Sequence, residues 1–183
     1  MTDADALSVS QTPALRKKIR SLGGAIRWAA VVWCIWGLGL LSWQWTHRAK
    51  FDAQVSKLYQ IDASAIPDGR YFGAAAVSLA SWAATAALVA TVWRMTQTFI
   101  DGRYFTLEAA RRLRLVALTG FAATLIDIVA RPIGTAILSS ELLAKLPFYV
   151  WLRPQDLLYA LICGFFLALA SIFAEASAPN AKS

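Results

Sequence analysis

The chain has 183 residues, of which 58% are hydrophobic and 16% are charged, with a formal net charge of +7. Soluble chains contain about 45–50% apolar residues, so this composition argues against an ordinary soluble domain. The excess lies in four runs that approach the ~20 residues a helix needs to cross a bilayer. The sequence therefore predicts an all-α integral membrane protein with four transmembrane helices in a single membrane domain, at about 26–45, 72–93, 115–138 and 157–174.

The positive charge is concentrated at particular ends of these runs. Basic residues precede the first run and lie between the second and third, whereas the opposite flanks mix basic with acidic residues. Because loops rich in Arg and Lys stay in the cytoplasm, we expect both termini to be cytoplasmic in a multi-pass protein of a bacterial inner membrane. The basic flanks should contact anionic lipid headgroups of the bilayer, and we expect no direct contact with nucleic acid.

The N-terminal half should contain one disordered segment and one outer helix. Residues 1–14 are polar and aperiodic, which predicts disorder. Beyond the first run, Phe51, Val55 and Leu58 share one helical face, so the first helix is expected to continue outside the bilayer as a short amphipathic helix. Pro67-Asp68-Gly69 should end it in a turn.

The second run is rich in small residues. Ala76, Ala80 and Ala84 recur at every fourth position. Because small side chains let membrane helices approach closely, these residues predict a packing face. We expect this helix to contact more neighbours than any other.

The loop between the second and third runs has a helix start and a basic face. Thr106 followed by Glu108 is typical of a helix N-terminus, with a capping hydroxyl and an acid in the first turn. Four arginines surround this start and form a surface suited to headgroups or to an acidic partner: Arg103, Arg111, Arg112 and Arg114.

The third run carries a stripe of small and polar residues on one helical face, called here the polar stripe: Leu113, Ala117, Gly120, Thr124, Asp127, Arg131 and Gly134. We expect this stripe to face other helices, with Gly120 and Thr124 as packing residues, because small side chains allow close approach. Asp127 and Arg131 are four residues apart, which suits an ion pair within one helix. A charge at mid-membrane costs about 2.5–3.5 kcal/mol, so such residues are often functional. Two interpretations stay open, namely a relay, ligand or coupling site, and a purely structural pair.

The C-terminal part should contain a second outer loop and the last helix. Residues 139–156 are too apolar for free water and too short to span, so we expect an interfacial loop, with Asp156 capping the last helix. Gly164 and Ala168 predict another packing face, and residues 176–183 are expected to be disordered.

Two short motifs resemble a known family. The pattern Gly102-x-x-Phe105-Thr106 followed by Arg112-Leu113-Arg114, together with the Gly164 to Phe173 ending of the last run, is similar to the bacterial four-span family called domain of unknown function 2975. Ala109 stands where that family often has Asn, and the family's acidic tail is missing. The resemblance implies a regulatory or accessory membrane protein, often encoded beside a small helix-turn-helix regulator, with no catalytic residues to carry over.

The sequence shows no pattern that points to catalysis, metal binding or a cofactor. A single His and two Cys, both within runs, supply neither a nucleophile with its base nor a metal site. We therefore expect no enzyme activity, no cofactor and no metal.

The leading hypothesis is a small inner-membrane protein with a regulatory or accessory role, in contact with a helix-turn-helix regulator or another membrane protein. The alternative is a small oligomeric transporter or channel that uses Asp127 and Arg131. A homo-oligomer through the small-residue faces is compatible with both.

Overall fold

The computed structural model describes residues 13–60, 62–101 and 106–177, and every regular element within these ranges is helical. The elements are α1 (Pro13–Thr46), α2 (Arg48–Tyr59), the 3₁₀ helix η2 (Ala63–Ala65), α3 (Asp68–Ile100), α4 (Leu107–Leu138), α5 (Ser140–Lys145), α6 (Phe148–Trp151) and α7 (Pro154–Ser177). Among the described residues, four helices, α1, α3, α4 and α7, are long and apolar enough to cross a membrane. The chain is thus a multi-pass membrane protein.

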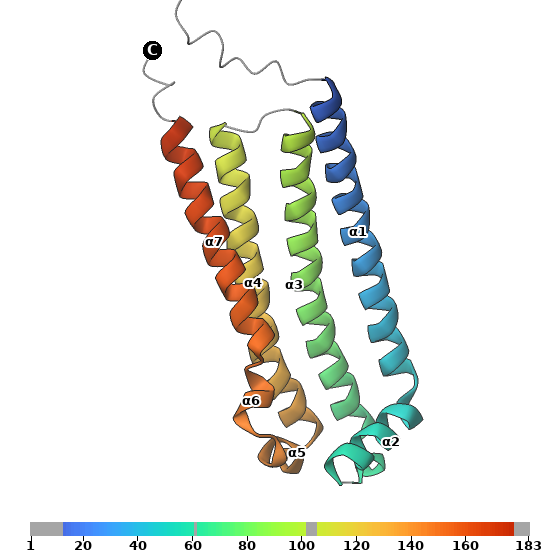
Figure 1. Ribbon diagram of the computed structural model, residues 1–183. Helices are drawn as coiled ribbons and strands as arrows, with labels where there is room; N and C mark the ends of the chain where they lie inside the picture. The colour runs from blue at the N-terminus through green and yellow to red at the C-terminus, as the bar shows by residue number, and fades with distance from the viewer. Residues whose placement is uncertain (1–12, 61, 102–105, 178–183) are drawn as a thin grey trace, which may run out of the picture.

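The four long helices form an open layer. They stand side by side in the order α1, α3, α4, α7, and the short elements gather at one end (Figure 1). We call that end the cap end and the opposite one, where α1 begins and α7 finishes, the termini end. Helices α1 and α7 lie at opposite sides of the layer and do not pack against each other (Figure 1). One chain therefore forms no closed bundle.

The helices extend beyond the predicted spans. Predicted disorder is wrong for residues 13–14 and 176–177, which are helical, while 1–12 and 178–183 lie outside the described residues. The prediction that the first helix continues outside the bilayer as an amphipathic helix is also wrong. The first helix ends at Thr46, and α2 begins at Arg48 after a break at His47, where φ is −102° and ψ is 62°.

Helix α4, and not the predicted second helix α3, occupies the centre of the packing. It packs along its length against both α3 and α7. The residues that allow this are small or apolar and face its neighbours: Ala109, Ala110, Leu113, Val116, Ala117, Gly120 and Ala123 are all buried. The predicted helix start is confirmed, because the Thr106 hydroxyl accepts a hydrogen bond of 3.2 Å from the Ala109 amide.

Gly120 lies at a close contact between α4 and α7. A Cβ at this position would lie 2.8 Å from the Sγ of Cys163, which is shorter than any normal contact. Cys163 is buried and forms no disulfide. The interface thus requires glycine opposite a small side chain, as close helix pairs in membranes commonly do.

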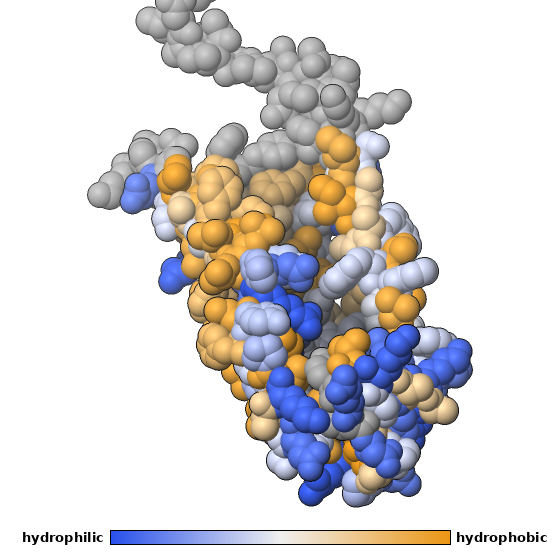
Figure 2. Space-filling view, turned by 60° about the horizontal axis from the view of Figure 1, so that its bottom comes forward, coloured by the Kyte–Doolittle hydropathy of each residue, from blue (hydrophilic) through white to orange (hydrophobic). Residues whose placement is uncertain are grey.

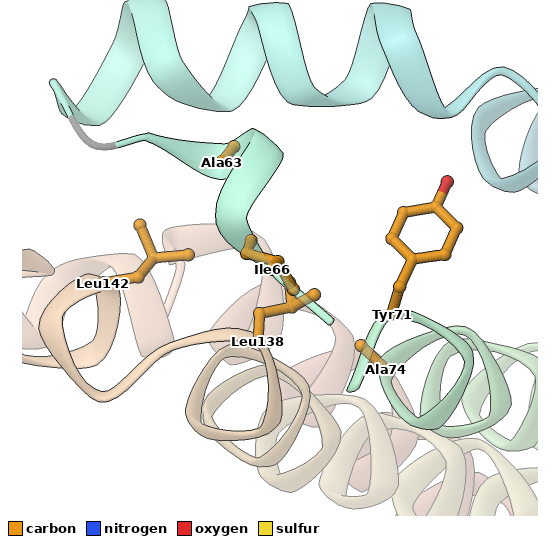
Figure 3. Close-up of a cluster of buried hydrophobic side chains, with 6 residues drawn as sticks. All are labelled: Ala63, Ile66, Tyr71, Ala74, Leu138 and Leu142. Carbon is orange, nitrogen blue, oxygen red and sulfur yellow. The ribbon is translucent and has the colours of Figure 1, made fainter. Parts of the chain in front are cut away.

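The cap end has its own hydrophobic cluster, called here the cap cluster. It joins η2, α3, α4 and α5 through Ala63, Ile66, Tyr71, Ala74, Leu138 and Leu142, and Figure 3 shows these side chains gathered beneath α2. Phe51 and Val55 of α2 pack against it, as their shared face predicted. The short connections are thereby folded onto the ends of the long helices.

Polar contacts surround the cap cluster. The Tyr71 hydroxyl donates a hydrogen bond of 2.9 Å to the carbonyl of Trp45. The Arg48 guanidinium lies near the Tyr71 ring and pairs with Asp52 and Asp68. Hydrophilic side chains gather at this end, whereas orange apolar residues cover much of the flank in view (Figure 2).

At the termini end, arginines join neighbouring helices. The Arg27 guanidinium of α1 lies 3.7 Å above the Trp93 ring of α3 and donates a hydrogen bond of 2.6 Å to Gln97. Arg112 of α4 donates a hydrogen bond of 2.7 Å to the carbonyl of Arg94 on α3 and pairs with Glu108. These contacts hold the open layer at the end away from the cap.

Replacement of Gly120 by Ala should destabilise the protein. The new methyl group would overlap Cys163, and overpacking of this kind costs about 1–3 kcal/mol, more than the ~1 kcal/mol that Ala gains in a helix. Thermal unfolding in detergent should show a lower midpoint for Gly120→Ala. The double variant Gly120→Ala/Cys163→Ala should recover most of the loss, and an unchanged midpoint in the single variant would contradict the close contact.

Candidate functional site

Arg131 of α4 connects two helices through its guanidinium. Nη1 donates to Asp156 Oδ2 at 2.7 Å and to the Trp151 carbonyl at 2.9 Å, while Nη2 donates to Asp156 Oδ1 at 2.8 Å. Nη2 also donates to Asp127 Oδ2, so the predicted pair is present. Asp156 therefore binds Arg131 with both carboxylate oxygens, the strongest geometry available to this pair of groups.

Asp156 is the residue that sequence reasoning did not connect to this site. Its expected role as a helix cap is real, because its Oδ2 accepts a hydrogen bond of 2.8 Å from the Arg153 amide, just before α7 begins. Its place outside the membrane was inferred from the end of the apolar run. The short helices α5 and α6 instead return the chain so that α7 starts beside Arg131. In the sequence, the only indication of this contact is that Asp156 lies next to the start of the last apolar run.

The two carboxylates differ in their exposure. The side chain of Asp156 is 3% exposed and that of Arg131 17%, whereas Asp127 is 44% exposed. Asp127 Oδ1 accepts a hydrogen bond of 2.8 Å from the Ser81 hydroxyl of α3. Asp127 and Arg131 therefore have different surroundings. Arg131 is enclosed by acceptors and joins α4 to α7, whereas Asp127 remains accessible.

Two cavities meet at Asp127. The first, called here the polar cavity, has a volume of about 500 Å³ between α1, α3 and α4, and its lining includes Gln44, Ser78, Ser81, Arg131, Thr135 and Arg153. The second, called here the apolar cavity, has a volume of about 570 Å³, and its lining includes Trp33, Leu88, Val92, Val116, Ile162 and Phe166. Thr85 and Asp127 line both. Together they form one groove along the layer.

The predicted packing residues are not all at helix contacts. Gly120 lies at the contact of α4 with α7, as predicted, whereas Thr124 lines the apolar cavity and Ala84 is half-buried. Ala76, Ala80, Gly164 and Ala168 are exposed, and a Cβ on Gly164 would meet nothing within 4 Å. Within one chain these four therefore do not form packing faces, because α3 and α7 turn other sides toward α4.

The predicted basic face is only partly available. Arg111 and Arg114 are exposed and make no ion pair within the described part of the chain, whereas Arg112 is bound by Glu108 and the Arg94 carbonyl. Arg103 lies outside the described residues. Arg111 and Arg114 are thus the free positive charges of this face.

Among residues 13–60, 62–101 and 106–177, no group of three or more His, Cys, Asp or Glu side chains is placed to hold a metal ion. The groove instead offers one accessible carboxylate, several hydroxyls and an apolar wall. Such a surface can bind a ligand or a partner.

Comparison with known proteins identified no family model, no curated protein and no solved structure that matches this chain.

Asp156→Asn should destabilise the protein far more than Asp127→Asn. Loss of one partner of a buried ion pair costs about 3–5 kcal/mol, whereas an exposed pair contributes about 0–1 kcal/mol. The thermal unfolding midpoint of the purified protein in detergent should therefore fall strongly for Asp156→Asn and little for Asp127→Asn. Equal losses in the two variants would contradict the division of roles between the carboxylates.

Proposed function

We propose that this chain is a small polytopic inner-membrane protein that serves as a regulatory or accessory subunit and contacts a partner protein. The observation that supports this most directly is the pair Arg111 and Arg114. Both are exposed at the termini end of α4, the central helix of the layer, and neither is used by an ion pair within the described residues. An acidic partner surface would complement them.

The open arrangement of the helices favours an accessory role over transport by a single chain. Helices α1 and α7 do not pack against each other, so the described helices of one chain do not close around a route across the membrane (Figure 1). Two short motifs of this chain resemble the family called domain of unknown function 2975. This resemblance also points to a regulatory or accessory role. A small helix-turn-helix regulator or another membrane protein is the partner class that it suggests.

The proposed orientation places both termini in the cytoplasm. The termini end carries Arg20, Arg27, Arg94, Arg111, Arg112 and Arg114. The cap end, with the exposed Phe148 and Tyr149 of α6, would then meet the outer interface of the membrane. Apolar aromatic side chains are common at that depth.

A second candidate is a small oligomeric transporter. It is favoured by the accessibility of Asp127, because a half-exposed carboxylate within a membrane helix is a common feature of substrate and ion pathways. A second copy would have to complete the pathway, since the layer is open. The exposed small residues Ala76, Ala80, Gly164 and Ala168 offer faces for such an assembly.

The orientation can be tested with reporter fusions. Green fluorescent protein joined after Ser183 should fluoresce, and alkaline phosphatase at the same position should be inactive, because the first folds in the cytoplasm and the second only outside it. Alkaline phosphatase inserted after Gln60, in the α2–η2 connection, should be active. The reverse pattern would contradict the proposed topology.

The partner role can be tested by affinity capture from detergent-solubilised native membranes. Wild type should retain a partner that Arg111→Gln/Arg114→Gln loses at equal protein level, because the two free charges are removed. Arg112 is left intact, since its replacement would also weaken the contact between α3 and α4.

Arg111→Lys/Arg114→Lys is the matched control. It keeps the positive charge that orients the chain and should retain the partner. Capture of anionic lipid alone, or equal capture by all three proteins, would overturn the docking proposal.

A further inference from the structure

The apolar cavity has a charged end of one sign. Its lining contains two carboxylates, Asp127 and Asp156, and no basic residue. Apart from Thr85 and Thr124, the rest of its wall is apolar or aromatic, and it comes from α1, α3, α4 and α7. Its volume of about 570 Å³ falls within the roughly 300–1,000 Å³ of pockets that bind small molecules.

The negative charge at this end is only partly compensated. Asp127, Arg131 and Asp156 together carry a net charge of −1, and Arg131 is enclosed by its acceptors. Arg153 lines the polar cavity together with Asp127 and offsets part of this negative charge from that side, but it is exposed and does not line the apolar cavity. An ionised group in an apolar setting is stabilised by a nearby opposite charge, so the accessible carboxylate of Asp127 favours a cation.

Aromatic side chains line both cavities. Trp33 and Tyr159 line the apolar cavity, and Trp82 lines the polar cavity beside Asp127. The faces of such rings attract organic cations, most strongly where water is excluded. The apolar wall beyond them, formed by Leu88, Val92, Val116, Ile162 and Phe166, can contact a hydrophobic body.

We propose that the apolar cavity is a binding site for an amphiphilic organic cation, whose charge pairs with Asp127 while its hydrophobic part lies along α3, α4 and α7. This inference does not depend on the partner role of Arg111 and Arg114. The ammonium of a lipid headgroup and that of a free amphiphilic amine share the required chemistry.

A second copy of the chain is a poor occupant for the same site. The only basic residue of the polar stripe is Arg131, which is already bound by Asp156 and Asp127. A symmetric contact through the groove would bring one Asp127 toward another, and like charges repel strongly in an apolar setting. The charge of the cavity thus selects a cationic ligand.

The test uses two probes of nearly equal shape and opposite charge. Tetraphenylphosphonium should bind the full-length protein in a non-ionic detergent by equilibrium dialysis, and tetraphenylborate should not. Asp127→Asn should weaken tetraphenylphosphonium binding by at least about tenfold, since a charge pair in an apolar site is lost. Asp127→Glu, which keeps the charge, should bind with an affinity much closer to that of wild type.

Glu141→Gln is the matched control, because it also removes one carboxylate, from an exposed residue that lines neither cavity, and should leave the affinity for tetraphenylphosphonium unchanged. Equal binding of both probes, or an unchanged affinity in Asp127→Asn, would overturn the proposal. Each variant is compared at the same monodispersity by gel filtration, so misfolding is distinguished from loss of the site.

Two further measurements test where the probe binds and which natural ligand occupies the cavity. Cys163 lines the cavity, so tetraphenylphosphonium should slow its alkylation by N-ethylmaleimide in a Cys34→Ala background. Unchanged alkylation at saturating probe would contradict the location. Displacement of the probe by added phosphatidylethanolamine would identify a lipid ammonium as the occupant, whereas displacement by dodecylamine and not by the lipid would identify a free amphiphilic cation.

Discussion

The structure depends above all on the contact of Arg131 with Asp156. A guanidinium within a membrane helix is tolerated when its donors are satisfied, and here two carboxylates and one carbonyl do this. Because Asp156 holds the guanidinium with both oxygens, the pair also sets where α7 begins relative to α4. With α7 positioned in this way, Cys163 lies opposite Gly120 farther along the same two helices.

The same contact explains why Asp127 is accessible. Asp156 binds Arg131 with both carboxylate oxygens, whereas Asp127 uses one oxygen for Arg131 and the other for the Ser81 hydroxyl, so the side chain of Asp127 stays partly exposed to the groove. The groove itself exists because, among the long helices, α1 packs against α3 and not along α4, which leaves this face of α4 open. A closed bundle would have buried the polar stripe completely. The openness of the layer and the accessibility of Asp127 are therefore one property of the fold.

The sequence predicted the helical class, the four apolar helices and the Thr106 start correctly, because these follow from local composition and capping. It also located the pair of Asp127 and Arg131, since spacing along one helix is a local property. The contact of Asp156 with Arg131 could not be predicted in this way, because it depends on how α5 and α6 direct the chain back toward α4. Exposure of Gly164 and Ala168 was likewise beyond reach, because small residues on several faces do not reveal which face packs.

The position of Asp156 in the chain has a consequence for biosynthesis. Synthesis proceeds from the N-terminus, so α1, α3 and α4 leave the ribosome before the residue that neutralises Arg131 exists. Until α7 inserts, Arg131 has only Asp127 as a carboxylate partner. The nascent three-helix intermediate thus carries a guanidinium in the bilayer that still lacks its bidentate acceptor, and insertion of α7 completes it.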